Sequence, residues 1–139
     1  MPAPLEYGHS ISLCEAKMML EAAEKEAVKH SWPMVIAIVD TGGHLIALHK
    51  MDNAQLGSIE IARLKAETSL KFKRPTQAFE AAVAGGGMGT KVLSMPHVMA
   101  LEGGLPIERC GKIVGAIGVS GMQSFDDAVV ARAAIAALS

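Results

Sequence analysis

The sequence is poor in charge and in aromatic side chains. It holds three Phe, one Trp and one Tyr among 139 residues, and charged residues make up only 19%. Thirteen basic residues face 14 acidic ones, so the formal net charge of -1 creates no field that would attract a phosphate backbone. Nucleic acid is therefore not an expected partner. So low a charged fraction in a small protein also predicts that other subunits cover part of its apolar surface, which indicates a homo-oligomer.

Cysteine is scarce, and no apolar run is long enough to cross a membrane. Cys14 and Cys110 lie far apart without metal-type spacing, and we expect them to be reduced, partly buried thiols. The longest strongly apolar run, 34–39, is too short for a bilayer, and residues 1–10 show no basic segment followed by an apolar one. These features predict a cytoplasmic protein with no membrane partner.

What the sequence does contain is small and medium aliphatic side chains. Half of the residues are hydrophobic, nine of them Met, and the length is typical of one domain. We therefore expect a single domain over residues 1–139. No linker, internal repeat or low-complexity tract interrupts it.

Hydrophobic spacing and turn residues predict the order of the elements. Ser12 and Glu15 form a capping box before a helix that runs to His30. Two strands joined by the Asp40–Gly43 turn form a hairpin. The remaining expected elements are helices at 56–74 and 76–83, strands at 97–102, 105–109 and 112–119, and a helix capped by Ser124 with Asp127 in its first turn. Cys110 and Gly111 are expected to form the hairpin turn between the last two strands.

This order does not alternate as repeated strand-helix-strand units, so a doubly wound parallel sheet is disfavoured. It predicts an α/β (α+β) domain in which an antiparallel sheet of about five strands is flanked by helices in a three-layer-like arrangement. The glycine-rich segment from Gly85 to Gly89 lies between the expected helix at 76–83 and the expected strand at 97–102. Its glycine spacing fits neither dinucleotide-binding nor phosphate-loop patterns, and we interpret it as a flexible cover over a pocket.

One carboxylate and two cations fall near an edge of the expected sheet. Asp52 follows the hairpin, and Arg63 and Lys65 lie on the next helix, where Lys65 borders the apolar stripe and is expected to be half buried. The functional interpretation is a clamp for an anion or carboxylate. The structural one is that Asp52 caps the helix region and pairs with one of the cations.

The five histidines, at positions 9, 30, 44, 49 and 97, show no metal-binding spacing. We expect no dedicated metal site. Any one of them could serve alone as an axial haem ligand, or could be an ordinary surface histidine. No nucleophile motif is readable.

Several blocks together resemble one family, the GlcG/HbpS family, over nearly the whole chain. These blocks are residues 37–40 with Gly42 and Gly43, 51–52, 61–63 with 65–66, 103–106, and 115–121 with Asp127. The resemblance implies an α/β domain with an antiparallel sheet, forming dimers that assemble further. It also implies haem binding, since some relatives bind haem, including an extracellular redox-sensor component and the C-terminal domain of a corrinoid adenosyltransferase. His9 and His97 are the candidate ligands here.

Glycines within these blocks indicate close packing. Gly115, Gly118 and Gly121 interrupt an apolar strand, which indicates that a helix, a subunit or a ligand approaches the backbone there. Gly103 and Gly104 would offer backbone N–H groups to a carboxylate. Together with Arg63 and Lys65 they are the candidate site for an anionic small molecule at a subunit junction.

The leading hypothesis is a cytoplasmic haem- or small-molecule-binding accessory protein of a catabolic pathway for glycolate, glycerol, diols or aromatic compounds. The alternative is a small enzyme acting on a hydroxy acid, diol or aromatic acid, with Asp52 or His97 as the acid/base group. A third hypothesis is an oligomeric scaffold without a ligand.

Overall fold

A five-stranded sheet forms the centre of the molecule, which is known from a computed structural model that describes residues 4–138. The longest strand, β5, pairs with β2 on one side and β4 on the other, and β3 pairs with the outer side of β2. The strands are β1 (Glu6–Tyr7), β2 (Val35–Val39), β3 (Leu45–Lys50), β4 (Gly104–Arg109) and β5 (Lys112–Ser120). Residues 1–3 and 139 of the expected domain lie outside the described residues.

The sheet is mixed, and the prediction of a purely antiparallel sheet is wrong in this detail. β2, β3, β4 and β5 pair antiparallel, but β1 runs parallel to β5, with Tyr7 opposite Ile113. β1 has two residues, both exposed, so it carries no hydrophobic alternation from which a strand could be predicted. The predicted class, a single α+β domain with helices flanking a five-stranded sheet, is confirmed.

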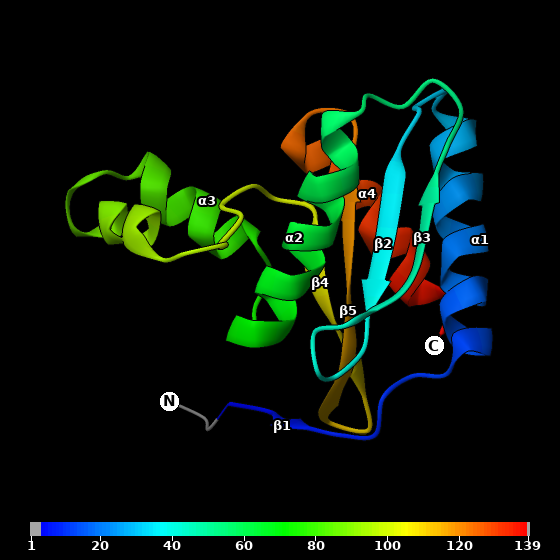
Figure 1. The fold of residues 1–139 in the computed structure, drawn as a ribbon, viewed down its shortest axis with the longest axis horizontal. Coiled ribbons are helices and arrows are strands. Elements are labelled where there is room, and N and C mark those ends of the chain that lie inside the picture. Colours follow the sequence, from blue (N-terminus) through cyan, green and yellow to red (C-terminus); the bar gives the residue numbers. More distant parts are fainter. Residues whose placement is uncertain (1–3, 139) are drawn as a thin grey trace.

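Helices cover both faces of the sheet and make a three-layer arrangement. α1 (Leu13–Lys29) and α4 (Ser124–Ala136) pack together on one face, and α2 (Gly57–Phe72) packs on the other (Figure 1). Side chains of β2 alternate between the faces, and all are buried because helices cover both sides. Ile36 and Ile38 face α1 and α4, whereas Val35, Ala37 and Val39 face α2.

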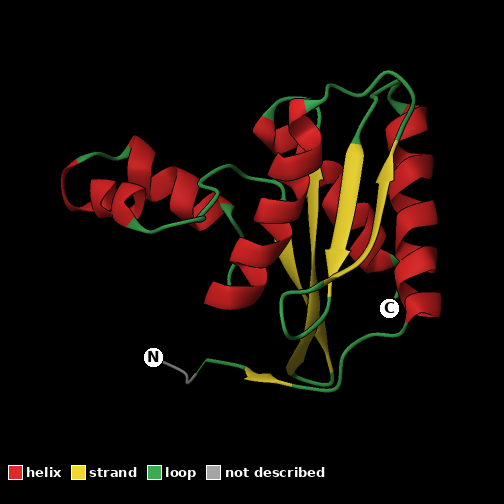
Figure 2. Cartoon of the chain, viewed as in Figure 1, coloured by secondary structure: helices red, strands yellow, loops and turns green. Residues whose placement is uncertain are grey.

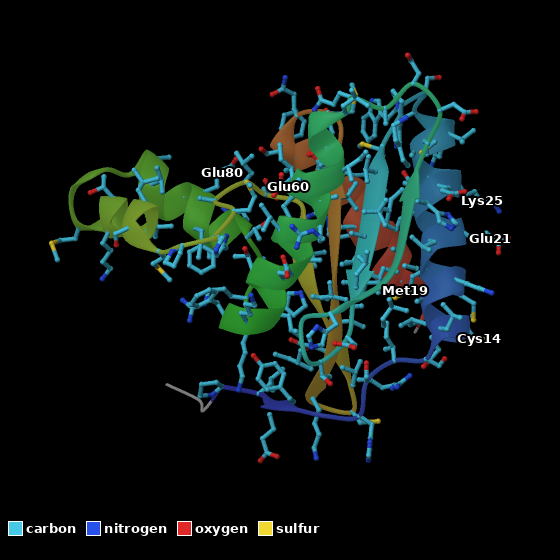
Figure 3. The ribbon with its side chains drawn as sticks, in the orientation of Figure 1. Cys14, Met19, Glu21, Lys25, Glu60 and Glu80 are labelled. Atoms are coloured by element: carbon cyan, nitrogen blue, oxygen red, sulfur yellow. The ribbon has the colours of Figure 1, made fainter. Side chains whose placement is uncertain are left out.

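The beginning of α1 confirms the predicted capping box. Ser12 accepts a hydrogen bond from the Glu15 amide, and the Glu15 carboxylate accepts one from the Ser12 amide. Figure 3 shows Met19 directed toward the sheet, while Cys14 and Lys25 point away from it. Both cysteines are free and exposed, so the expectation of partly buried thiols is wrong.

α3 (Gln77–Ala84) and the 3-10 helix η1 (Gly87–Ser94) project from the sheet as an arm (Figures 1 and 2). We call residues 77–94 the arm. The glycine segment, expected as a loop, therefore continues into a 3-10 helix. Gly89 allows η1 to lie directly on α3, because a Cβ there would stand 2.0 Å from the carbonyl oxygen of Ala82.

Residues 97–102 form no strand, and that prediction is wrong. His97 has a left-handed backbone with φ 64°, and the Met99 amide donates to the side chain of Thr68 instead of to a neighbouring strand. The predicted turn at Cys110 and Gly111 is confirmed, with both residues in the left-handed conformation of a tight hairpin. The N-cap of α4 is Gln123 and not Ser124.

α2 contacts the backbone of β5 at Gly118. A Cβ on Gly118 would stand 2.0 Å from the carbonyl oxygen of Ala62 and 2.6 Å from the amide nitrogen of Ala66. The close packing predicted for this glycine is thus with a helix. No helix among the described residues is long and apolar enough to cross a bilayer.

A pair of Gly to Ala substitutions tests this contact. Gly118→Ala forces backbone away from backbone, so we expect it to lower the free energy of unfolding by about 3 kcal/mol or more. Gly57→Ala, at the start of α2, meets nothing within 4 Å and should change stability by about 1 kcal/mol at most, in the stabilising direction. Urea unfolding of both variants measures the difference. Equal stabilities would contradict the close approach of α2 to β5.

Candidate functional site

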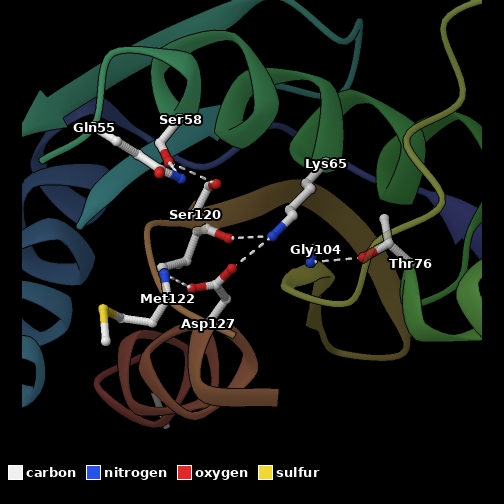
Figure 4. Close-up of polar contacts among 9 residues, drawn as sticks. Gln55, Ser58, Lys65, Thr76, Gly104, Ser120, Met122 and Asp127 are labelled. Carbon is white, nitrogen blue, oxygen red and sulfur yellow. Dashed lines mark hydrogen bonds and ion pairs between the residues drawn. The ribbon is translucent and has the colours of Figure 1, made fainter. Parts of the chain in front are cut away.

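A buried ion pair joins α2 to α4. Lys65 Nζ lies 2.9 Å from Asp127 Oδ2, and the two residues are only 1% and 2% exposed. Lys65 was expected to be half buried and is fully enclosed. Figure 4 shows the two side chains directed toward each other between the helices.

The pair connects the two helical layers at the edge of β5. The Val119 amide donates to the Gly103 carbonyl, but the Val119 carbonyl accepts from Lys65 Nζ at 2.9 Å. The ammonium thus occupies the position beside β5 next to the first residue of β4, Gly104, which pairs with Gly118. On the other side of the pair, Asp127 Oδ1 accepts the Met122 amide at 3.0 Å. The Asp127 side chain therefore fixes the turn that leads into α4.

Gly103 and Gly104 are packed against this pair. A Cβ on Gly103 would stand 2.8 Å from Lys65 Nζ, and one on Gly104 would stand 2.5 Å from the Lys65 carbonyl oxygen. The Gly104 amide already donates to Thr76 Oγ1 at 2.9 Å, as Figure 4 shows. The structure thus brings Lys65, Gly103 and Gly104 together, but inside the core, where their polar groups bind Asp127, Val119 and Thr76.

Desolvation dominates the ionisation of Asp127. Burial raises the pKa of its carboxyl above the ordinary value of 3.8, while the Lys65 ammonium and the Met122 amide act in the opposite direction. The electrostatic attraction is therefore partly consumed by removing the two groups from water. Two hydroxyls continue the polar cluster, with Ser120 Oγ donating to Ser58 Oγ at 3.0 Å.

A second cluster lies on the outer face of α2. Arg63 and His97 line a groove of about 300 Å³ together with Lys71. The remaining lining residues are Glu60, Leu64 and Glu67. Arg63 Nη1 binds Glu67 at 2.8 Å, and its Nη2 lies 3.7 Å from Glu60. We call this hollow the His97 groove. It unites one imidazole, two cations and two carboxylates.

The other predicted residues lie elsewhere. His9 is exposed in the bend between β1 and α1. Asp52 is exposed beyond β3 and lines a separate hollow of about 500 Å³ with Glu24 and His49, which bind each other. In residues 4–138 no ion pair joins Asp52 to a cation, and the N-cap of α2 is Leu56, so the structural interpretation of Asp52 is wrong.

Several residues of these clusters were not singled out as site residues from sequence. Lys71 follows Arg63 and Glu67 at helical spacing, which is a readable signal for one exposed face of α2. Asp127 was treated as part of a helix start. Its partner Lys65 is 62 residues away, and no local pattern predicts that contact. The Glu24 to His49 contact likewise joins distant segments.

Substitutions that remove one of the two charges test the buried pair. Asp127→Asn leaves the Lys65 ammonium buried without a counter-charge, so we expect a loss of about 3–5 kcal/mol in the free energy of unfolding at pH 7. In Lys65→Met the pKa of Asp127 rises further, because the ammonium that lowers it is gone. A carboxyl whose folded pKa is raised binds its proton more tightly when folded, so stability falls as pH rises from 3.8 through that raised pKa.

The free energy of unfolding that Lys65→Met loses relative to the unsubstituted protein should therefore become smaller as the pH is lowered from 7 toward 4. The loss in Asp127→Asn should not become smaller over this range. Urea unfolding across this pH range measures both. A deficit of Lys65→Met that stays constant with pH would contradict burial of an uncompensated Asp127.

Comparisons with known proteins agree with this fold. The family described as haem degrading protein HbpS-like matches residues 11–136. Protein GlcG of Escherichia coli strain K12 is 40% identical over 105 residues, which cover 76% of this chain and 77% of that protein. The corrinoid adenosyltransferase PduO of Citrobacter freundii is 32% identical over 99% of this chain, but this match covers only 42% of PduO.

Solved structures extend the likeness to three dimensions. A double mutant of HbpS from Streptomyces reticuli has a TM-score of 0.86 and 28% identity, with 100% of this chain and 99% of that chain covered. A complex of PduOC with haem has a TM-score of 0.83 and 30% identity, with 92% and 94% covered. The predicted resemblance is confirmed: with this match, this identity and this shared fold, the chain belongs to the GlcG/HbpS family.

Proposed function

We propose that this protein is a haem-binding accessory protein and that the His97 groove is its haem site. The observation that carries the proposal is the meeting of His97 with Arg63 and Lys71 on one accessible surface. The complex of PduOC with haem is a relative of the same fold, which supports haem as the ligand class.

The donor set of the groove suits haem. His97 offers an imidazole nitrogen of the kind that ligates haem iron, and Arg63 and Lys71 are cations suited to the two propionates. Arg63 is held by Glu67 at 2.8 Å, so this guanidinium must share or exchange its partner when a propionate arrives. Leu64 provides an apolar contact beside the ring. Bound haem would supply an iron centre with one protein ligand, and the chain would orient it.

Two further parts of the proposal concern setting and assembly. Exposed free thiols at Cys14 and Cys110 suit a reducing compartment, which supports a cytoplasmic role. The catabolic setting is proposed from the family. Large apolar side chains exposed on the surface support a homo-oligomer, namely Val28, Leu56, Met88, Leu93 and Phe125.

The geometry gives less support to the acid/base alternative. That hypothesis takes Asp52 or His97 as the acid/base group and Arg63 or Lys65 as the anion clamp. Asp52 and Arg63 line separate hollows, and Lys65 is enclosed in its pair with Asp127. An enzyme built on Asp52 therefore needs rearrangements of the described residues, whereas His97 and Arg63 already share the groove that we propose as the haem site.

Titration with haemin tests the proposed site. We expect a saturable shift of the Soret band with the unsubstituted protein, and its loss in His97→Ala because the iron ligand is removed. Arg63→Gln and Lys71→Gln should each weaken binding by about three- to tenfold, since each removes one partly exposed ionic contact.

His9→Ala is the matched control, because it removes an exposed histidine outside the groove and should leave the titration unchanged. Loss of the shift in His9→Ala with retention in His97→Ala would move the ligand to His9. No Soret shift with any of the proteins would remove haem from the proposal.

Multi-angle light scattering tests the assembly. One chain has a mass of 14.5 kDa, and we expect at least twice that mass in solution because of the exposed apolar side chains. A mass of one chain at micromolar concentration would contradict the proposed oligomer.

A further inference from the structure

An apolar cleft opens between the arm and the C-terminal end of α2. Its volume is about 350 Å³, at the lower end of the range for small-molecule sites. Residues from α2, the following turn, α3 and η1 line it, namely Phe72, Arg74, Ala78, Phe79, Ala82, Lys91, Val92 and Met95. We call it the arm cleft. It shares no lining residue with the His97 groove.

The walls of the arm cleft are built by the packing of the arm itself. Phe72 and Phe79 meet edge to face, with ring centroids 5.5 Å apart, and fix α3 against the end of α2. Gly89 sets η1 directly on α3 at Ala82. The small side chain of Ala82 and the flexible side chain of Met95 both line the cleft.

Both charged side chains that line the cleft are cations. Arg74 Nε donates to the Phe72 carbonyl at 2.9 Å, which leaves the terminal nitrogens of its guanidinium for another acceptor. The same guanidinium lies 5.7 Å from the centroid of Phe79 and is thereby positioned over the apolar wall. Lys91 contributes the second positive charge, and no Asp or Glu lines the cleft.

We propose that the arm cleft is a second ligand site, which takes a small apolar carboxylate. The alkyl or aromatic part of the ligand packs against Phe79, Val92 and Met95, and its carboxylate binds Arg74 and Lys91. The proposal is independent of haem binding, since it uses other residues. It also gives a role to the glycine-rich segment, because η1, which that segment starts, forms one wall of the site.

Octanoate is a suitable probe, and the methyl group of Met95 is a suitable reporter. In protein labelled with ¹³C at the methionine methyl groups, we expect a saturable shift of the Met95 signal, assigned by Met95→Leu. Octan-1-ol has the same chain without the charge and should bind about tenfold or more weakly, because it cannot pair with both cations.

Variants separate the parts of the site. Arg74→Gln and Lys91→Gln should each weaken octanoate binding by about three- to tenfold, and Lys25→Gln, an exposed cation on α1, should not change it. Ala78→Leu, at an exposed position of α3, should fill the cleft and abolish the Met95 shift while leaving the haemin titration unchanged.

Three results would overturn the proposal. Equal binding of octanol and octanoate would remove the role of the cations. Absence of a Met95 shift at saturating octanoate would remove the site. A Met95 shift that follows protein concentration and not the probe would show that a second copy of this chain occupies the cleft. Failure of haemin binding alone would leave this proposal standing and would affect only the His97 groove.

Discussion

The contact between Lys65 and Asp127 is the constraint on which the rest of the architecture depends. α2 and α4 lie on opposite faces of the sheet, and this pair joins them around the end of β4. Two opposite charges in the core are tolerated because each has a further partner: the ammonium donates to the Val119 carbonyl, and the carboxylate accepts from the Met122 amide. Only glycine fits at positions 103 and 104 beside them. Lys65, Gly103, Gly104 and Asp127, which belong to the blocks that carry the family resemblance, are therefore components of one buried polar cluster.

The two proposed binding sites lie on the parts of α2 and the arm that this buried cluster does not use. Lys65 points inward from α2, whereas Arg63 and Lys71 lie on its outer face toward His97. Beyond the end of α2, Thr76 binds Gly104 in both directions through its amide and its hydroxyl, and thus ties the base of α3 to β4. The arm starts from this anchored point and projects away from the sheet (Figure 2), and its cleft lies between the arm and the end of α2.

Local sequence patterns predicted most helices and strands, but they could not predict contacts between segments that lie far apart in the sequence. The capping box at Ser12 and the turn at Cys110 involve residues within a few positions of each other, so sequence spacing contains the information. β1 depends on a parallel pairing with a strand more than 100 residues later, and no pattern in Glu6 and Tyr7 indicates it. The apolar letters of 97–102 resemble a strand, yet the left-handed His97 and the contact of Met99 with Thr68 place that segment along α2.

The candidate site shows the same division. Arg63, Lys65, Gly103, Gly104 and His97 were all selected from sequence, but as members of one anion clamp or as separate ligands. Arg63 and Lys65 are two positions apart, and on an α-helix this spacing places them on nearly opposite faces. Arg63 therefore points outward and Lys65 inward. Which of them reaches solvent depends on where β5 lies, and that is a property of the tertiary fold.

The seven residues from His97 to Gly103 connect the surface groove to the buried pair. This segment is held at Met99 by Thr68, and it ends where Gly103 touches the Lys65 ammonium. The middle of this connection is attached to α2 and its inner end packs against the ammonium, so the surface position of His97 depends on contacts made in the core.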